Sequence, residues 1–306
     1  MLRTNEMVRK LSADNSMLLT LSDEDIVNIQ KILLDMLSDF DALCRKHSLS
    51  YFLCGGTLLG AVRHKGFIPW DEDMDIGMPR KDYDRLTELL LSEYGDKYWV
   101  QNIWNNKKYD ILFMKMRKKG TRFVEIFETD LEHAGIFIDI YPLDNVPDFA
   151  PAYWIHGLVS NILQFCCSCV RVRQKRERYF TYFNDKAVHK AVKIKSFIGK
   201  SLGFLSLQRW CQLADRWAAC CRKDTTRRVT FASGRKHYFG EMCSRDSFFP
   251  LKEVKFCGKC FYSLADPTGY LSLLYGDYMT IPDAKEQQRH TILDLDLGET
   301  YTKLQD

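Results

Sequence analysis

The sequence lacks a strong excess of charge of either sign. Its 44 Lys and Arg against 40 Asp and Glu leave a formal net charge of +4 over 306 residues. Nucleic-acid-binding domains are usually more basic, so the composition gives no support for nucleic acid as a partner. Internal repeats and low-complexity segments are also missing. A hydrophobic content of 46% is that of a soluble globular protein, and the length allows one large domain or two.

A secretory signal peptide is also missing at the start of this sequence, where residues 1–15 carry scattered charges and no apolar run. We therefore expect a cytoplasmic protein whose eleven cysteines are reduced. The spacing of Cys257 and Cys260 is the one that suggests zinc or redox chemistry, but a structural zinc site usually needs a second pair. A β-hairpin with Gly258 and Lys259 at its turn is the favoured interpretation.

Four carboxylates crowd into five positions of the stretch GFIPWDEDMDIGMP, residues 66–79. A calcium-binding EF-hand loop is excluded, because its glycine and bidentate glutamate positions hold other residues. In a strand, Asp71, Asp73 and Asp75 share one face and the intervening apolar residues share the other. Carboxylates this close repel one another unless a cation lies among them, which favours a divalent-metal site. A solvated acidic turn is the alternative.

The segments around this stretch alternate between helix and strand patterns. Residues 22–47 predict an amphipathic helix capped by Ser22. A short strand, a glycine pair and a short helix ending near residue 66 follow. Further predictions are a helix at 81–95, strands at 98–103, 111–117, 123–127 and 135–141, and a hairpin turn at 118–121.

Two further features add to the acidic stretch. Gly55, Gly56 and Thr57 lie at a strand-to-helix junction, where backbone amides can receive a phosphate, although a plain tight turn is the alternative. Asp139 lies within the apolar run GIFIDIYPLD. A carboxylate in such a setting is costly unless it is paired or metal-bound, so we expect Asp139 to join the acidic cluster.

Residues 149–170 contain no Asp, Glu, Lys or Arg, and the basic segment RVRQKRER follows at once. Twenty-two such residues could span a bilayer, with the basic flank on the cytoplasmic side, but several polar side chains make this a poor span. A buried helix is the first expectation, an interfacial helix the second and a true span the last. As an interfacial helix, the segment would bring the cations of residues 171–178 to anionic headgroups and hold the protein peripherally on the membrane.

The order of these features is typical of the nucleotidyltransferase fold. The stretch YFLCGGTLLGAVRHKGFIPWDEDMDIGMPRKDYDRL resembles the LicD family of phosphocholine and related phospho-alcohol transferases, which includes the fukutin-type transferases. The segments MKMRKKGT, GIFIDIYPLDNVP and YGDYMTIPDAKEQQRH are similar to further family segments in the same order. The resemblance covers roughly residues 20–147 and, more loosely, 240–292.

The resemblance implies an α+β fold, with a nucleotidyltransferase-like mixed sheet flanked by helices, a helical segment and a C-terminal extension. The expected boundaries are a catalytic core with an N-terminal helix at 1–147, a membrane-surface or acceptor-binding helical segment at 148–232, and a segment that completes the catalytic domain at 233–306.

The resemblance also implies a reaction. A phospho-alcohol such as phosphocholine would move from a CDP-alcohol to a hydroxyl of a cell-surface glycan or its lipid-linked precursor, with CMP as the leaving group. Asp73, Asp75 and Asp139 would hold Mg²⁺ or Mn²⁺ against the diphosphate. Asp139 or Asp71 would take the acceptor proton.

Other residues of the matching segments are expected to contact the substrate. Lys115 and Arg117 alternate on one strand face, where they could bind phosphate oxygens, or form a solvated face. The full expected set is Gly55, Gly56, Thr57, Arg63, His64, Lys115, Arg117, Arg289 and His290. Two rival functions are a conventional nucleotidyltransferase that attaches the nucleotide itself, and a non-catalytic membrane-surface adaptor. An adaptor would have no need of the buried carboxylates.

Overall fold

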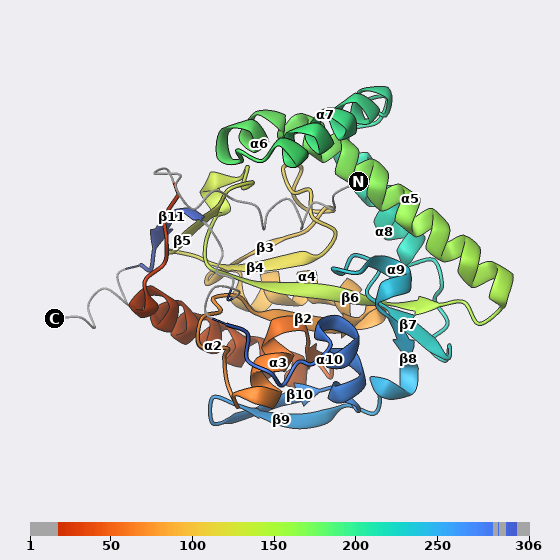
Figure 1. Ribbon diagram of the computed structural model, residues 1–306. Coiled ribbons are helices and arrows are strands. Elements are labelled where there is room, and N and C mark those ends of the chain that lie inside the picture. The colour runs from red at the N-terminus through yellow and green to blue at the C-terminus, as the bar shows by residue number, and fades with distance from the viewer. Residues whose placement is uncertain (1–17, 284–286, 288–291, 299–306) are drawn as a thin grey trace.

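The computed structural model describes residues 18–283, 287 and 292–298. A mixed sheet in the order β1-β2-β6-β4-β3 forms its centre, and β7 and β8 continue this sheet beyond β6 (Figure 1). The strands are β1 Phe52–Leu53, β2 Asp75–Pro79, β3 Tyr98–Gln101, β4 Met114–Lys118, β6 Phe137–Val146, β7 Arg228–Thr230 and β8 Met242–Ser244. The pair β2 and β6 is parallel and the other neighbours are antiparallel. The α+β mixed sheet is thus confirmed.

The predicted N-terminal helix is confirmed as α2 (Asp23–Lys46). Ser22 accepts a hydrogen bond from the backbone of Asp25, whose side chain bonds back to the Ser22 amide in a capping box. The predicted apolar stripe is fully buried: Ile26, Ile29, Leu33, Leu37 and Phe40 are 0% exposed. Each such side chain contributes about 1.5–3 kcal/mol when buried, so the stripe fixes α2 on the sheet.

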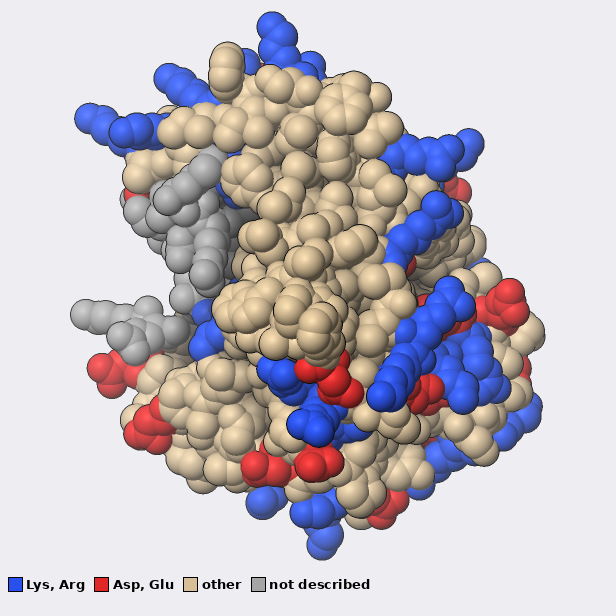
Figure 2. Space-filling model, turned by 90° about the vertical axis from the view of Figure 1, so that its right-hand side faces the viewer, with Lys and Arg blue, Asp and Glu red and all other residues tan. Residues whose placement is uncertain are grey.

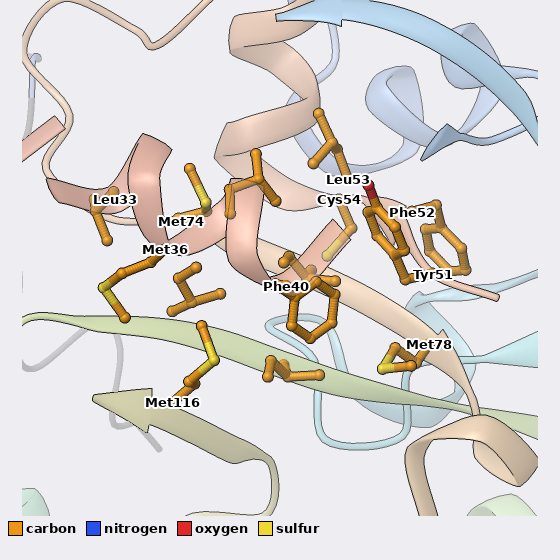
Figure 3. Close-up of a cluster of buried hydrophobic side chains, with 14 of the residues drawn as sticks. Leu33, Met36, Phe40, Tyr51, Phe52, Leu53, Cys54, Met74, Met78 and Met116 are labelled. Carbon is orange, nitrogen blue, oxygen red and sulfur yellow. The ribbon is translucent and has the colours of Figure 1, made fainter. Parts of the chain in front are cut away.

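Helix α2 packs on the face of the sheet that carries the apolar residues of β2. Figure 3 shows Met36 and Phe40 of α2 together with Met78 of β2 and Met116 of β4 in one buried cluster. Met74, Ile76 and Met78 are all 0% exposed. The alternation predicted from the sequence therefore places the acidic side chains on the opposite face, although β2 begins only at Asp75 and the chain before it is irregular.

The helix after the glycine pair and the helix after the acidic strand are also confirmed. They are α3 (Gly55–Arg63) and α4 (Arg80–Tyr94). The C-terminal part adds α9 (His237–Gly240), the 3-10 turn η2 (Arg245–Ser247) and α10 (Pro267–Tyr275), and another 3-10 turn, η1 (Leu131–His133), lies just before β6. In Figure 1, α10 lies beside α3, and the two helices contact one another.

The predicted hairpin at 118–121 is wrong. The turn joins β4 to β5 (Arg122–Glu125), but β5 pairs with β11 (Ile292–Asp296) and not with β4. The segment before β6 lies between them, because the Lys118 amide donates to Ile136 O and the Phe123 amide donates to Ala134 O. By contrast, the hairpin at the Cys257–Cys260 spacing is confirmed as β9 (Lys252–Phe256) and β10 (Lys259–Ser263).

The turn of the β9–β10 hairpin lies one residue earlier than predicted. Its two central residues are Cys257 and Gly258, with φ of 49° and 79°, the left-handed pair that a two-residue hairpin turn favours. All eleven cysteines of the chain are free thiols, as expected for a protein without a disulfide framework.

The middle of the chain forms the helical segment. It consists of α5 (Ala150–Gln174), α6 (Arg176–Tyr182), α7 (Lys186–Ser201) and α8 (Leu207–Ala218), and α5 packs against both α7 and α8. Among the described residues, α5 alone is long and apolar enough to cross a membrane. In its most apolar stretch of 18 residues, 39% of the residues are buried inside the protein. The expected buried helix is therefore buried on one face only.

A buried charge network anchors the helical segment to the sheet. Arg80 at the start of α4 donates to both carboxylate oxygens of Asp144 on β6, at 2.7 and 3.2 Å, and to Asp215 on α8 at 2.9 Å. The side chains of these three residues are at most 12% exposed. Strand β7 also lies within the range 148–232, so this range supplies strands as well as helices, and the proposed boundaries stay predictions.

Candidate functional site

The register of the central strands places three charged residues side by side. Asp75 on β2 pairs with Asp139 on β6, and Asp139 pairs in turn with Lys115 on β4. Paired residues of neighbouring strands point to the same face of a sheet. The order carboxylate, carboxylate, ammonium is thus a direct result of β2 and β6 being parallel neighbours. This row lies on the face opposite α2.

Asp139 is a nearly buried carboxylate in the middle of the row. Its side chain is 13% exposed, and Oδ1 lies 3.2 Å from Lys115 Nζ but accepts no hydrogen bond from a described residue. Burial raises the pKa of Asp139 to about 6; Lys115 lowers it, and the charges of Glu125 and Asp73 raise it. A buried oxygen without a hydrogen bond is uncommon in folded proteins, and here the ammonium of Lys115 balances its charge.

The glycine pair leaves room for the carboxylates of the acidic stretch. Gly55 has φ of +51°, and a Cβ placed there would lie 2.2 Å from Asp75 Oδ2. At Gly56, a Cβ would lie 2.9 Å from Asp71 Oδ2 and 3.9 Å from Asp73 Oδ1. The three carboxylates therefore converge on the start of α3, and side chains at these two positions would displace them.

The start of α3 also fixes the carboxylate of β2. The Gly56 amide donates to Asp75 Oδ2 at 3.2 Å, and the Thr57 hydroxyl accepts from the Asp75 amide at 2.7 Å. Thr57 is 3% exposed, so its observed contact is with the strand. The expectation that this helix terminus binds a phosphate stays a prediction.

The converging carboxylates line a large cavity of about 1800 Å³. Its far wall is the inner side of α5, with Asn161, Gln164 and Arg171. The loop 231–237 and the end of α10 form a further side. A cavity of this size exceeds the usual range of about 300–1,000 Å³ for small-ligand sites, so it has room for two substrates together.

The structure adds two residues of loop 231–237 that the sequence did not reveal. Ser233 Oγ is buried and has no hydrogen-bond partner among the described residues. Arg235 is exposed at the cavity and makes no hydrogen bond or ion pair with a described residue. Burial raises the pKa of Tyr275, the carboxylates of Asp71, Asp73 and Asp75 raise it further, and Arg235 opposes them. Arg235, Tyr275 and the three carboxylates thus line the same cavity.

Glu241 is a third residue that the sequence did not reveal. It is 3% exposed, lines the cavity and accepts a hydrogen bond from the Lys236 amide at 2.7 Å. Burial raises its pKa to about 7, although the backbone hydrogen bond and the charges of Lys236 and Arg235 lower it. No periodic pattern surrounds this residue in the sequence, and the one local signal is the basic triplet GRK at 234–236.

The two predicted cations of β4 are buried in ion pairs. Lys115 is 2% exposed, with Nζ 3.0 Å from Glu125 as well as close to Asp139. Arg117 is 1% exposed and donates to Gln101 at 2.7 Å and to Glu128. The alternative of a solvated strand face is therefore wrong, while direct contact with a substrate stays a prediction.

Arg63 and His64 lie at the C-terminal end of α3. Arg63 Nη1 donates to the carbonyls of Tyr278 and Thr280, at 2.8 and 3.2 Å, and Arg63 Nε donates to His64 Nε2 at 2.9 Å. Arg63 thus ties α3 to the chain after α10. Burial and the charge of Arg63 lower the pKa of His64. The predicted residues Arg289 and His290 lie outside the described residues.

The described residues also contain a group with metal-ligand spacing that was not predicted. One ligand atom each of Asp130, Glu132 and His133 lies within 4.8 Å of the others, so the group could hold a metal ion. Asp130 Oδ2, however, already accepts hydrogen bonds from Gln101 and Asn106 and lies 2.8 Å from His133 Nδ1. Those contacts give Asp130 an evident role in holding the loops together.

Comparison with known proteins agrees with this geometry. Residues 48–156 match the family LicD/FKTN/FKRP, nucleotidyltransferase domain. This part of the chain belongs to that family. The match contains the glycine pair, the acidic strand, Lys115 and Asp139, so the resemblance seen in the sequence is confirmed. The protein is accordingly an enzyme, a transferase of the LicD type.

Individual relatives extend the match over most of the chain. Over 272 residues, the protein is 26% identical to the lipopolysaccharide cholinephosphotransferase LicD of Haemophilus influenzae, covering 86% of this chain and 94% of that enzyme. It is 33% identical over 137 residues to an uncharacterized protein of Rickettsia prowazekii, covering 40% and 52% of the two chains. A stretch of 45 residues is 47% identical to the human ribitol 5-phosphate transferase FKRP, covering 15% of this chain and 9% of that protein.

Proposed function

We propose that this LicD-type transferase moves a phospho-alcohol, such as phosphocholine, from a CDP-alcohol to a hydroxyl of a cell-surface glycan or its lipid-linked precursor. The convergence of Asp71, Asp73 and Asp75 beside the glycine pair, at the wall of a cavity large enough for two substrates, carries this proposal, and Asp139 pairs with Asp75 on the next strand. The near full-length likeness to a cholinephosphotransferase supports phosphocholine as the first alcohol to test.

The fold family implies a divalent cation, and the residues present fit one. Asp139 Oδ1 makes an ion pair with Lys115 but accepts no hydrogen bond from a described residue, and the absent Cβ of Gly56 leaves a space that carboxylate oxygens surround. Asp73, Asp75 and Asp139 would hold Mg²⁺ or Mn²⁺, for which oxygen ligands are preferred. When bound, the ion would neutralise charge on the diphosphate.

The chain's own residues divide the remaining tasks. Lys115 holds Asp139 in place, through the 3.2 Å ion pair described above. Asp71 is our choice as acceptor of the hydroxyl proton, because Asp139 is already engaged with Lys115 and Asp71 lies on the cavity. Arg235 and Ser233, which line the same cavity, would bind phosphate oxygens, since an arginine that pairs with no described residue is suited to an anion.

Product analysis tests the proposal. The protein is incubated with Mg²⁺, a hydroxyl acceptor and a panel of CDP-alcohols that includes CDP-choline and CDP-ribitol. CMP release and attachment of the phospho-alcohol to the acceptor are measured. The acceptor product is the phosphodiester that carries the alcohol, one per CMP released. We expect CMP release that EDTA abolishes and that Asp75→Asn reduces by a hundredfold or more. Asp96→Asn, a carboxylate exposed at the surface, is the matched control and should be fully active.

The second candidate function is a conventional nucleotidyltransferase. The same carboxylates could serve a reaction in which a nucleoside triphosphate donates its nucleotide and releases pyrophosphate. The two reactions have different products, so the same protein incubated with nucleoside triphosphates distinguishes them. Pyrophosphate release without any CMP release from CDP-alcohols would replace the first proposal with the second.

A further inference from the structure

Helix α5 carries an uncovered apolar stripe on its outer side. Its large side chains are substantially exposed: Trp154 58%, Ile155 58%, Leu158 57%, Ile162 50% and Phe165 41%. At 3.6 residues per turn, these five positions fall within about 100° of the helix circumference. They form one continuous strip along the N-terminal two thirds of the helix, which we call the outer stripe.

The outer stripe is bare because α7 covers only the C-terminal part of α5. Lys195 Nζ donates to Ser168 Oγ at 2.9 Å, and the space for a Cβ at Gly199 is taken by Cys169 O, at 2.4 Å. On its other side, α5 packs against α8, where His156 Nε2 lies 2.8 Å from Trp217 O. The described residues thus cover the inner side and the C-terminal end of α5 and leave the outer stripe open.

Helix α7 and the turn after it expose a similar mixture of residues. Phe197 is 76% exposed, Phe204 72% and Ile194 43%. Lys190, Lys193 and Lys200 of the same helix are also exposed. Lys186 and Arg209 are exposed as well, and residues 186–209 contain no acidic residue; Asp185 caps the N-terminus of α7. This part of the surface is therefore both apolar and strongly basic.

The structure corrects which cations are available at this surface. The sequence suggested the run at 171–178, but much of that run is turned inward. Lys175 Nζ lies 2.8 Å from Asp110, Arg171 pairs with the same carboxylate, and Arg178 donates to Ile126 O at 2.8 Å. The exposed lysines of α7 take the place of these three residues.

We infer that the outer stripe of α5 and the exposed face of α7 dock on an anionic lipid bilayer. Aromatic and aliphatic side chains with lysines around them, and almost no carboxylates, match the interface between acyl chains and anionic headgroups. Figure 2 shows a broad face without charged side chains, with Lys and Arg along its upper and right-hand margins. Such an extended uncharged face marks an interaction site rather than ordinary surface.

A second copy of the chain fits this surface less well. A symmetric dimer places the same patch of each subunit against the other. The lysines of the two α7 helices would then face one another, and like charges across an interface are unfavourable. An anionic bilayer instead supplies the complementary charge to both the lysines and the apolar residues they surround.

The docking face borders the cavity of the candidate site. Phe165 belongs to the outer stripe and also lines the cavity, as do Asn161 and Gln164 on the adjoining side of α5. The bilayer surface would therefore meet the cavity at its edge. An acceptor carried on a lipid could reach the carboxylates from there, a consequence that rests on the proposed function.

Vesicle co-sedimentation tests the docking without any substrate, so its result is independent of transferase activity. The full chain is mixed with vesicles of phosphatidylcholine alone, or of phosphatidylcholine with phosphatidylglycerol, at low and high salt. We expect at least tenfold stronger binding to the anionic vesicles and weakening by salt. Equal binding to both kinds of vesicle, no binding to either, or release from cell membranes only by detergent would overturn the inference.

A double variant and a triple variant locate the docking face. Leu158→Ser with Phe197→Ser, and Lys190→Gln with Lys193→Gln and Lys200→Gln, should each reduce binding to anionic vesicles more than tenfold. The controls are Leu131→Ser, at a leucine 60% exposed on η1, and Lys81→Gln with Lys107→Gln and Lys255→Gln, at exposed lysines elsewhere. The controls should bind like the wild type. A solution dimer that Phe197→Ser dissociates would assign the face to a second copy instead.

Discussion

Gly55→Ala should displace a carboxylate of the candidate site, and it should also lower stability as any substitution of a glycine with positive φ does. Gly55 has φ of +51°, a conformation that costs an L-residue about 1–2 kcal/mol. A Cβ there would also lie 2.2 Å from Asp75 Oδ2 and 3.0 Å from its Cγ, so the carboxylate must move. We expect a loss of transferase activity of a hundredfold or more, together with a modest loss of stability, because a displacement of about 1 Å at a reacting centre can cost 10²-fold.

Gly258→Ala is the matched control. Gly258 has φ of +79° with nothing within 4 Å of its Cβ position, in the β9–β10 turn. Both variants should lose about 1–2 kcal/mol of unfolding free energy in urea, but only Gly55→Ala should lose activity. Full activity in Gly55→Ala, or an equal loss of activity in both variants, would refute the reasoning that the glycine exists to admit Asp75.

Four further predictions concern the charged groups in and near the cavity. The pKa of Glu241 lies at about 7 against an ordinary 4.5. The free energy of unfolding of the wild type should therefore fall relative to that of Glu241→Gln as pH rises from about 4.5 to 7, by at most about 3 kcal/mol. Urea unfolding at pH 4 and pH 8 measures this change, and a difference between the two proteins that does not vary with pH would contradict the prediction. Arg117→Ala should lower the free energy of unfolding, measured in urea, by about 3 kcal/mol or more, because Glu128 would stay buried without its partner. Lys115→Met should mainly reduce turnover, because Asp139 would no longer be held in place. An undiminished turnover would show that Lys115 does not position Asp139. Arg235→Gln should raise the KM for the CDP-alcohol about tenfold, as expected for the loss of a charge-assisted hydrogen bond of about 1.5–3 kcal/mol, and should leave the melting temperature unchanged. The control is Arg209→Gln, at an exposed arginine on α8, which should leave the KM unchanged. Equal KM values in both variants would exclude Arg235 from the site.

The sequence was informative where one periodicity ran without interruption. The stripe of α2 and the alternation that ends in Met74, Ile76 and Met78 both follow from a single repeating spacing, and both are buried as predicted. The neighbouring position of Asp75 and Asp139 could be anticipated only because like charges near apolar segments require a shared partner. Their register, and the ion pair of Asp139 with Lys115, depend on strand order, which local patterns do not specify.

The sequence was misleading where tertiary contacts decide. The turn at Gly120 looked like that of a hairpin, but the segment before β6 takes the place beside β4, and β5 pairs with β11 instead. Ser233 and Arg235 lie in an irregular loop whose residues form no periodic pattern. For α5, composition correctly indicated an apolar helix but could not tell which side would be covered, because α7 and α8 lie far from its outer stripe in sequence.

The network of Arg80 with Asp144 and Asp215 has a consequence for how the protein unfolds. Strand β6 carries Asp139 in its first half and Asp144 in its second, so the strand that bears a site carboxylate is also the one to which α8 is anchored. If α8 detached, Arg80 would lose its ion pair with Asp215 and the buried charges of Arg80 and Asp144 would no longer be fully compensated, which costs several kcal/mol. The helical segment and the sheet should therefore melt together, as one calorimetric transition, and proteolytic excision of residues 148–232 should yield no folded remnant.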